Sequence, residues 1–345
     1  MFMQRVKVTI VDIAKEAGVS PATVDRVLNE RDGVRRVTVE KVLSVAQRLN
    51  YPLPAQLIAR PGLIHLSFDF LLPSGPNTFM QSIGRISEST EHSDGIFSAR
   101  GRLHQIESFN PGALSRALLK IGENTNGVAF VALEHPLVRE AVNTLVDRGI
   151  PVATFVSDLS HSRRMGYIGV DNRAAGRTAG HLMGRFIGPK SGKVAVIAGS
   201  LSYRGHEERE AGFRQILGEE FPSLRIVGLA EGRDDYSRNY VEMKKILHDH
   251  PDLLGIYNIG AGSQGVAEAL IEMRRADSVC FIGHELTEFT RQYLIDGVVD
   301  AVINQDPRNE VLGAMRLLTN CHAKRDPMAG VETVRIEVFV RENMP

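Results

Sequence analysis

The chain has 345 residues, 43% of them hydrophobic, which is enough for two or three domains with cores of their own. Its 41 basic and 41 acidic residues cancel, which excludes a chain that is basic throughout. Cys280 and Cys321 lie far apart and outside any C-x-x-C spacing, which excludes a disulfide framework and a cysteine zinc site.

The N-terminus lacks the pattern of a signal peptide, and no segment has the run of about 18 apolar residues that a membrane span requires. We therefore expect a cytoplasmic protein with no membrane partner.

Residues 1–60 form a basic head with ten Lys/Arg against six Asp/Glu, whereas residues 61–345 hold 31 against 35. Thr9 to Asp12 reads as a capping box, and the helix that follows is predicted to end at Gly18. Ser20, followed by Pro21, predicts the start of a second helix. A third apolar stripe is predicted to form a helix that ends at Asn50; it consists of Val39, Val42, Leu43, Ala46 and Leu49.

Two helices joined by a tight turn on a basic head indicate a helix-turn-helix, whose second helix reads base edges in the major groove. Thr23, Asp25 and Arg26 are the candidates for base contacts, since Arg26 can donate two hydrogen bonds to guanine and Asp25 can accept from cytosine. The other DNA-binding candidates, several of them placed to grip phosphates, are Thr9, Ser20, Ala22, Asn29, Arg35, Arg36 and Tyr51. The alternative is an ordinary three-helix bundle with a solvated charged face.

Beyond Pro61-Gly62, short β-branched or apolar runs alternate with helical stretches, which is typical of α/β sheets. Eight strands are expected, at 63–68, 127–133, 151–156, 193–199, 224–229, 253–259, 278–283 and 300–303. The polar segment 157–166 is predicted to cross between two lobes.

Gly260, Gly262 and Gly265 form a literal G-x-G-x-x-G between a predicted strand and helix, with Glu285 about twenty residues further on. This pattern keeps open an NAD-dependent oxidoreductase with the pyrophosphate at the helix N-terminus. The position argues against it, because too little chain follows for a second mononucleotide half. No H-x-x-x-H pair occurs, His206 reads as a surface or loop residue, and no metal site is predicted.

The segment VTIVDIAKEAGVSPATVDRVLN (8–29) resembles the DNA-binding head of the LacI/GalR family of bacterial transcription regulators, and the similarity continues in outline along the chain. The resemblance implies a two-lobed α/β body like a type I periplasmic binding protein, dimerisation through the body, no cofactor and no catalysis. The implied domains are a head at 1–50, a hinge at 51–61 and a body at 62–345. Lobe 1 is expected at about 62–157 plus 299–325, and lobe 2 at about 163–297 plus 326–345.

The resemblance also implies contacts with a small effector held between the lobes. The run 209–213 matches the family's R-x-x-G-aromatic stretch, which makes Arg209 the leading cleft residue. Asn258 and Gln305 match an asparagine that bonds a sugar hydroxyl and a glutamine at the lobe crossing. Asn77, Phe79 and Tyr236 resemble polar and aromatic contacts to a polyhydroxylated ligand, although each alone is equally explained as a cap or a core residue.

The sequence departs from the family pattern at three places. Glu285, preceded by His284, stands where most members have an aspartate. The first-lobe aspartate falls at Ser157 or Asp158, with Asp158 preferred on chemical grounds. The hinge reads PLPAQLIARPG (52–62), in which Leu57 is the candidate for the apolar wedge that family members insert into the minor groove.

We therefore predict a homodimeric, sequence-specific transcription regulator, a repressor, that binds a near-palindromic operator in double-stranded DNA. Its operator affinity is predicted to depend on a bound sugar, sugar acid or polyol, while a nucleobase-type ligand stays open.

Overall fold

The computed structural model describes residues 8–29, 31, 33–34, 36–49, 51–53, 64–121 and 124–345. The chain divides into two compact units, residues 1–65 with 93–98 and residues 66–92 with 99–345. Within the described ranges, no helix is both long enough and apolar enough to cross a bilayer.

The head contains three helices, α1 (Ile10–Ala17), α2 (Pro21–Leu28) and α3 (Arg36–Arg48). The predicted capping box is confirmed, because Asp12 N–H donates to the Thr9 hydroxyl and Thr9 N–H donates to Asp12 Oδ2 at 2.8 Å. Gly18 adopts a left-handed φ of 65° and ends α1, and Ser20 Oγ accepts from Thr23 N–H at 3.1 Å and caps α2. The head core consists of Ile13, Ala14, Ala17, Val24, Val27, Leu28, Val42, Leu43, Val45 and Ala46.

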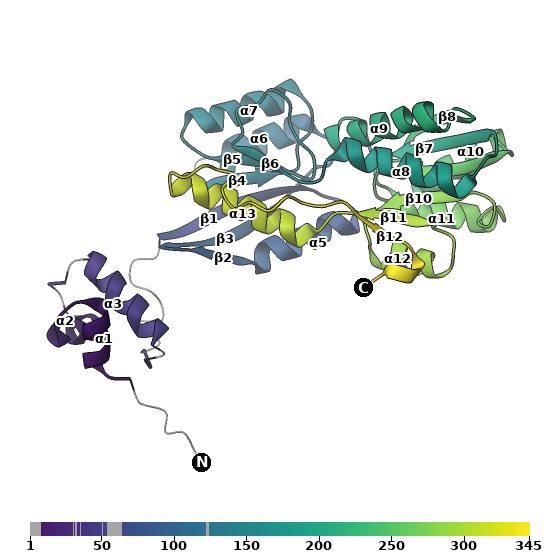
Figure 1. Cartoon of the computed structure of the whole chain (residues 1–345). Helices are drawn as coiled ribbons and strands as arrows, with labels where there is room; N and C mark the ends of the chain where they lie inside the picture. Colours follow the sequence, from purple (N-terminus) through teal and green to yellow (C-terminus); the bar gives the residue numbers. More distant parts are fainter. Residues whose placement is uncertain are drawn as a thin grey trace, which may run out of the picture. The chain divides into compact units, whose positions relative to one another are not determined.

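The first lobe is built on a six-stranded sheet with the strand order β2-β3-β1-β4-β5-β6. Its strands are β1 (Ile64–Pro73), β2 (Glu91–Asp94), β3 (Phe97–Ile106), β4 (Gly127–Phe130), β5 (Val152–Phe155) and β6 (Gly166–Ile168). Helices α5 (Thr78–Ser89), α6 (Pro111–Ile121) and α7 (Pro136–Asp147) belong to this part of the chain (Figure 1). Strands β1, β4, β5 and β6 run parallel.

The second lobe has a six-stranded sheet with the order β12-β11-β10-β9-β7-β8. Its strands are β7 (Gly192–Ala198), β8 (Leu224–Glu231), β9 (Leu253–Asn258), β10 (Cys280–His284), β11 (Ala301–Asn304) and β12 (Glu337–Phe339). Its helices are α8 (Asn172–Ile187), α9 (Arg204–Glu220), α10 (Tyr236–Asp249), α11 (Ser263–Glu272), α12 (Glu288–Ile295) and the 3₁₀ turn η1 (Arg341–Asn343). Among the described strands of this sheet, β7 to β11 run parallel and β12 pairs with β11 in the antiparallel sense.

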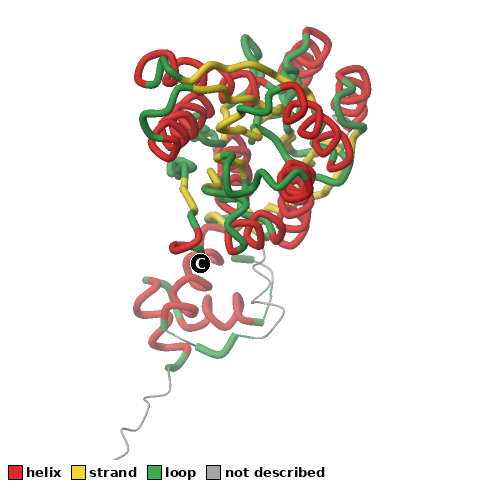
Figure 2. Tube along the Cα trace, turned by 90° about the vertical axis from the view of Figure 1, so that its right-hand side faces the viewer, coloured by secondary structure: helices red, strands yellow, loops and turns green. Residues whose placement is uncertain are grey.

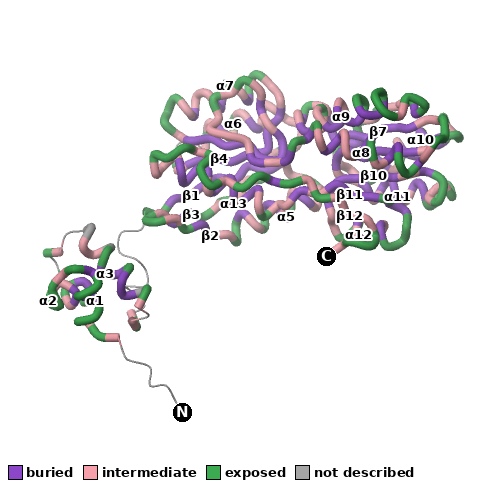
Figure 3. Tube along the Cα trace, viewed as in Figure 1, coloured by how far each residue is buried: buried purple, intermediate pink, exposed green. Residues whose placement is uncertain are grey.

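In both lobes, helices enclose the strands, as the yellow strands among red helices in Figure 2 show. The buried residues follow these strands (Figure 3), and Phe68, Phe70, Phe130, Phe155 and Tyr257 are among the largest fully buried side chains. The apolar runs whose alternation with helical stretches predicted an α/β body therefore lie in the cores of the two sheets.

The lobe crossings differ from the predicted ones. Strand β6 pairs with β5, so the chain leaves the first lobe after Ile168. The predicted crossing within 157–166 and the predicted start of lobe 2 at 163 are therefore both too early. Strand β11 pairs with β10 in the second sheet, so the return to the first lobe follows Asn304 and not residue 299. Helix α13 (Pro307–His322) then packs against α5 and strands β4 to β6. A three-residue strand such as β6 is too short to show a periodicity.

Two glycines set the distance between α8 and α9, the helices nearest to the lobe crossing. A Cβ atom on Gly176 would lie 1.9 Å from the Arg209 carbonyl oxygen, and one on Gly212 would lie 2.1 Å from that of Arg173. Only glycine permits such an approach of two backbones. The close packing places Arg209 of α9 directly beside Asn172, the first residue of α8.

Candidate functional site

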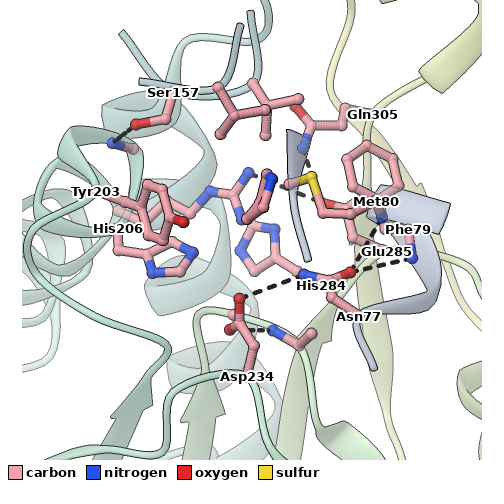
Figure 4. Close-up of a pocket in the computed structure, with 17 residues that line it drawn as sticks. Asn77, Phe79, Met80, Ser157, Tyr203, His206, Asp234, His284, Glu285 and Gln305 are labelled. Atoms are coloured by element: carbon pink, nitrogen blue, oxygen red, sulfur yellow. Dashed lines mark hydrogen bonds and ion pairs between the residues drawn. The ribbon is translucent and has the colours of Figure 1, made fainter. Parts of the chain in front are cut away.

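A pocket lies between the lobes, where the carboxyl ends of strands from both sheets meet. The first lobe contributes Asn77, Phe79, Met80 and Ser157, and the second contributes Tyr203, His206, Arg209, Asp234, His284 and Glu285, with Gln305 at the crossing. Figure 4 shows Tyr203 and His206 on one side of this pocket and Asn77 and Phe79 on the other. Open α/β sheets bind ligands at this edge.

Arg209 is the central cation of the pocket, and its side chain is almost fully buried. Nε donates to Asn172 Oδ1 at 2.7 Å and Nη1 donates to the Ile259 carbonyl oxygen at 3.0 Å. Nη2 lies 3.8 Å from Glu285 Oε1. The two hydrogen bonds fix the guanidinium plane, so Nη2 stays directed at the acidic side of the pocket.

Glu285 follows strand β10 and has a left-handed φ of 64°, which is unusual for a residue with a long side chain. Its Oε1 accepts from Gln305 Nε2 at 2.8 Å, whereas neither Glu285 Oε2 nor Gln305 Oε1 has a hydrogen-bond partner among the described residues. Burial raises the pKa of the Glu285 carboxyl to about 7, although Arg209 and Gln305 oppose the increase.

Two histidines line the pocket as neutral groups. Burial lowers the pKa of His284 well below its usual value, and the nearby Arg209 lowers it further. His284 Nε2 shares a hydrogen bond of 2.7 Å with the Tyr257 hydroxyl. Burial also lowers the pKa of His206, whose ring packs edge-on against Tyr203. The neutral imidazoles supply hydrogen-bonding groups without adding positive charge.

Several hydrogen bonds join the two lobes around the pocket, among them that from Gly205 N–H to Ser157 Oγ at 3.3 Å and one from Asn77. Asn77 Oδ1 caps α5 by accepting from the N–H groups of Phe79 and Met80, and its Nδ2 donates to Asp234 Oδ2 at 3.3 Å. The other oxygen of Asp234 accepts from Ala261 N–H at 2.9 Å. The described arrangement is therefore one in which the lobes are in contact.

The structure brings five of the eight predicted cleft residues into one pocket: Asn77, Phe79, Arg209, Glu285 and Gln305. Tyr236 lines an adjoining pocket that shares Asn77 and Asp234 with the first, and its hydroxyl donates to Glu268.

Asn258 and Asp158 lie outside the pocket lining. Asn258 donates to the backbone of Gly260 and Ala261 and to Ser263, so it holds the turn that follows β9. The Asp158 carboxylate is bound by Arg164 and Thr154, which corrects the preference for Asp158: Ser157 is the residue that lines the pocket.

Tyr203, His206 and Asp234 are pocket residues that the sequence did not single out. His206 is half-buried in the first turn of α9 and lines the pocket, so the expectation of a surface or loop residue is wrong. Asp234 follows the end of β8, whereas Tyr203 precedes α9 and His206 lies in the first turn of that helix. A polar residue just after a predicted strand is the signal that could have identified Asp234.

The glycines of the G-x-G-x-x-G have local structural causes. Gly262 has a left-handed φ of 78° and precedes α11, and a Cβ on Gly265 would lie 2.1 Å from the Tyr236 carbonyl oxygen. Gly260 lines the pocket, where a Cβ would lie 2.3 Å from Asp234 Oδ1. The turn therefore shapes the pocket.

On the head, the outer face of α2 carries Ala22, Arg26 and Asn29, opposite the buried Val24 and Val27. Arg26 is exposed, and its carbonyl oxygen accepts from Arg31 N–H at 2.8 Å, but no side-chain hydrogen bond or ion pair joins its guanidinium to any described residue. Its guanidinium is therefore available for an outside partner.

Other DNA-binding candidates already have side-chain contacts within the head. Asp25 accepts from Asn29 Nδ2 at 2.8 Å and pairs with Arg31 at 3.3 Å, so base readout by Asp25 requires these contacts to break. The Thr9 and Ser20 side chains cap helices, with Ser20 Oγ also 2.8 Å from Thr23 Oγ1, and Tyr51 packs against the head core. Arg35, Leu57 and the side chain of Arg36 lie outside the described residues.

A helix-turn-helix head and a two-lobed body with a polar pocket together define the class of ligand-responsive DNA-binding regulators. Residues 117–324, more than half of the chain, match the periplasmic binding protein domain, and residues 9–52 match the bacterial regulatory proteins of the lacI family. The chain belongs to the LacI family of bacterial regulatory proteins, with a helix-turn-helix DNA-binding domain and a periplasmic-binding-protein-like body.

Similar individual proteins include a regulator and a sugar-binding protein. Catabolite control protein A of Priestia megaterium is 24% identical over 245 residues, which are 70% of each chain. The xylose/arabinose-binding protein XylF of Sulfolobus acidocaldarius is 24% identical over 203 residues, so the match spans 54% of this chain and about half (49%) of XylF. These relatives do not support the nucleotide-dependent oxidoreductase alternative.

A solved structure has the fold of the body. The solute-binding protein of an ABC transporter from Burkholderia graminis, in complex with D-arabinose, superimposes with a TM-score of 0.73 at 21% identity, covering 82% of this chain and 98% of that one.

Proposed function

We propose that the protein is a cytoplasmic, homodimeric repressor without catalytic activity, whose affinity for a near-palindromic operator is set by a small carbohydrate-type ligand in the cleft. The ligand class is a sugar, sugar acid or polyol. The carrying observation is that one chain combines an unpaired, exposed Arg26 on α2 with a buried polar pocket around Arg209.

The outer face of α2 supports DNA readout. Arg26 can donate two hydrogen bonds to a guanine, and a bidentate contact of this kind contributes about 1–3 kcal/mol of discrimination. The capped and packed α1 and α2 hold this side chain on a rigid element, which favours readout of a defined base.

The pocket supports a polyhydroxylated ligand. Arg209, Gln305 and Glu285 offer planar donors and acceptors that suit vicinal hydroxyl groups, and Phe79 and Tyr203 offer apolar faces that suit C–H surfaces. The names of XylF and of the arabinose complex add support, because both proteins bind sugars with a body of this fold.

Ligand control requires that the ligand bind two arrangements of the lobes with different affinity. The Asn77–Asp234 hydrogen bond exists only when the lobes are in contact, so a ligand that bridges them favours this arrangement. A coupling between ligand and operator of about 1–3 kcal/mol is expected.

The test begins with selection of the preferred duplex from a random pool by the full-length protein, followed by titration of that duplex and of an unrelated one. Arg26→Ala is expected to weaken binding to the selected duplex by about 1–3 kcal/mol and to affect the unrelated duplex less. Arg48→Ala, which removes the same charge from α3, is the matched control and is expected to weaken both duplexes alike. An equal loss on both duplexes for Arg26→Ala contradicts base readout by this residue.

A further inference from the structure

The innermost part of the pocket contains acceptor atoms without donors. Gln305 Nε2 donates to Glu285 Oε1, which leaves the outer oxygens of this bonded pair, Glu285 Oε2 and Gln305 Oε1, without partners. The two residues are only 8% and 2% exposed. Figure 4 shows the pair facing the pocket beside Met80. A buried acceptor without a donor is destabilising, so the pocket is complementary to a ligand that supplies donors.

Among the described residues that line the pocket, the buried side-chain atoms without partners are these two oxygens, and both are acceptors. Arg209 already directs Nε to Asn172 and Nη1 to Ile259, which leaves Nη2 for a ligand. A ligand that satisfies these acceptors must therefore supply N–H or O–H groups.

The charges around the pair are unbalanced towards acid. Asp234 and Glu285 are the two carboxylates that line the pocket. Glu310, fully buried in the first turn of α13, adds no charge to them, because its burial and then Glu285 raise the pKa of its carboxyl and favour the protonated form. Arg209 is the cation that faces these groups, while His206 and His284 are neutral because burial lowers the pKa of each. A cationic ligand corrects this imbalance, whereas an anionic one increases it.

We propose that the ligand is a sugar or polyol in which an amine replaces one hydroxyl group, and that its ammonium group binds between Glu285 Oε2 and Gln305 Oε1. One ammonium group has three donors and can serve both oxygens, whereas one hydroxyl can serve only one. Arg209 Nη2 then donates to a neighbouring hydroxyl of the ligand. This inference rests on the proposed function and narrows its ligand class, since it disfavours sugar acids.

The test uses ligand sets that differ in one group. Calorimetric titration and thermal shift of the full-length protein at pH 7.5 compare sorbitol, 1-amino-1-deoxysorbitol and gluconate, then glucose with glucosamine, and an inositol with its aminocyclitol analogue. Within a set, the amine is expected to bind at least about tenfold more tightly than the neutral parent, because it forms charge-assisted hydrogen bonds, and gluconate is expected not to bind.

Substitution separates this role of Glu285 from general packing. Glu285→Gln keeps the shape but removes the charge, and is expected to reduce the preference for the amine to about twofold or less. Glu288→Gln, an exposed residue at the start of α12, is the matched control and is expected to retain the full preference.

A second measurement does not depend on the variant. For the wild type, the ratio of the amine's affinity to that of its neutral parent is expected to fall between pH 8 and pH 6, as the Glu285 carboxyl takes up a proton in the field of Arg209, His284 and Glu310. The pH series uses 1-amino-1-deoxysorbitol and sorbitol, because the primary alkyl ammonium of 1-amino-1-deoxysorbitol stays largely protonated over this range.

The outcomes separate the two proposals. A neutral or anionic member that binds as tightly as its amine, an unchanged ratio between pH 6 and pH 8, or an unchanged preference in Glu285→Gln overturns the amine assignment and leaves the carbohydrate regulator standing. If no member of any set binds, both the amine assignment and the proposed ligand class fail.

Discussion

The buried carboxyl of Glu285 makes the stability of the body depend on pH. Burial raises its pKa from an ordinary 4.5 to about 7 in the folded protein. Between these two values the unfolded chain releases this proton first, so ionisation favours the unfolded state. Stability associated with Glu285 is therefore greatest below about pH 4.5 and is lost as the pH rises to about 7.

The size of the effect follows from the two pKa values. The difference between 4.5 and about 7 corresponds to about 3 kcal/mol of lost stability above pH 7. Glu285→Gln cannot ionise and keeps the same chain length, so it avoids this loss. We expect the variant to be about as stable as the wild type near pH 4.5 and more stable by up to about 3 kcal/mol at pH 8.

The assay is thermal unfolding of the full-length wild type and variant in one set of buffers from pH 4.5 to pH 8.5. A gain of about 3 kcal/mol corresponds to a rise in the unfolding temperature of the body on the order of 5 °C or more. The other titrating groups are present in both proteins and largely cancel in the difference, except Glu310, whose pKa Glu285 raises. If the variant unfolds at a lower temperature than the wild type at pH 8, or if the difference shrinks as the pH rises, the assignment of a destabilising buried charge is refuted.

Three further substitutions test the site and the elements that hold it. Arg209→Ala is expected to abolish the ligand response and to leave operator affinity without ligand unchanged, with the exposed Arg214→Ala on the same helix as control; a response at unchanged ligand concentration contradicts the cleft assignment. Ser20→Ala is expected to destabilise the head by about 1 kcal/mol in thermal unfolding, because it removes the cap of α2; an unchanged head stability would mean that the cap is not needed. Gly176→Ala is expected to destabilise the body by at least about 2 kcal/mol, whereas Gly218→Ala, with open space around it on α9, is expected to be neutral or stabilising; equal effects would contradict the close helix contact.

Much of the fold could be predicted because many of its helices and strands have local signals in the sequence, such as helix caps and apolar runs. The caps at Thr9 and Ser20 and the apolar stripes define the head helices, and eight strands appear as short β-branched or apolar runs. Strands β2, β3, β6 and β12 were missed. Strand β3 reads FSARGRLHQI, with polar and charged residues that resemble a loop, and β6 and β12 have three residues each. Their pairing depends on neighbours far away in the sequence, which periodicity does not reveal.

The site was predictable only where a residue type and a position both pointed to it. Arg209 and Gln305 were found by resemblance, and they lie in the pocket. Asp158 was wrong because the chemistry of a carboxylate cannot tell whether Arg164, six residues later, already binds it. The unpaired oxygens of Glu285 and Gln305 could not be predicted at all, since they depend on how two loops from different parts of the chain meet.

The position of Gln305 gives the pocket a direct connection to the first lobe. Gln305 lies between β11 of the second sheet and α13, which begins at Pro307 and packs against α5 and the first sheet. A ligand held by Glu285 and Gln305 therefore acts on a lobe crossing, and the Asn77–Asp234 hydrogen bond joins the start of α5 to the second lobe on the other side of the pocket. Because a ligand can shift an equilibrium only by its difference in affinity for the two arrangements, contacts at such a crossing carry more of the response than contacts within either lobe. For this reason we expect substitutions at Gln305 to reduce the response to a saturating ligand. Substitutions of pocket residues such as His284, whose hydrogen-bond partner Tyr257 belongs to the same lobe, change mainly the ligand concentration needed.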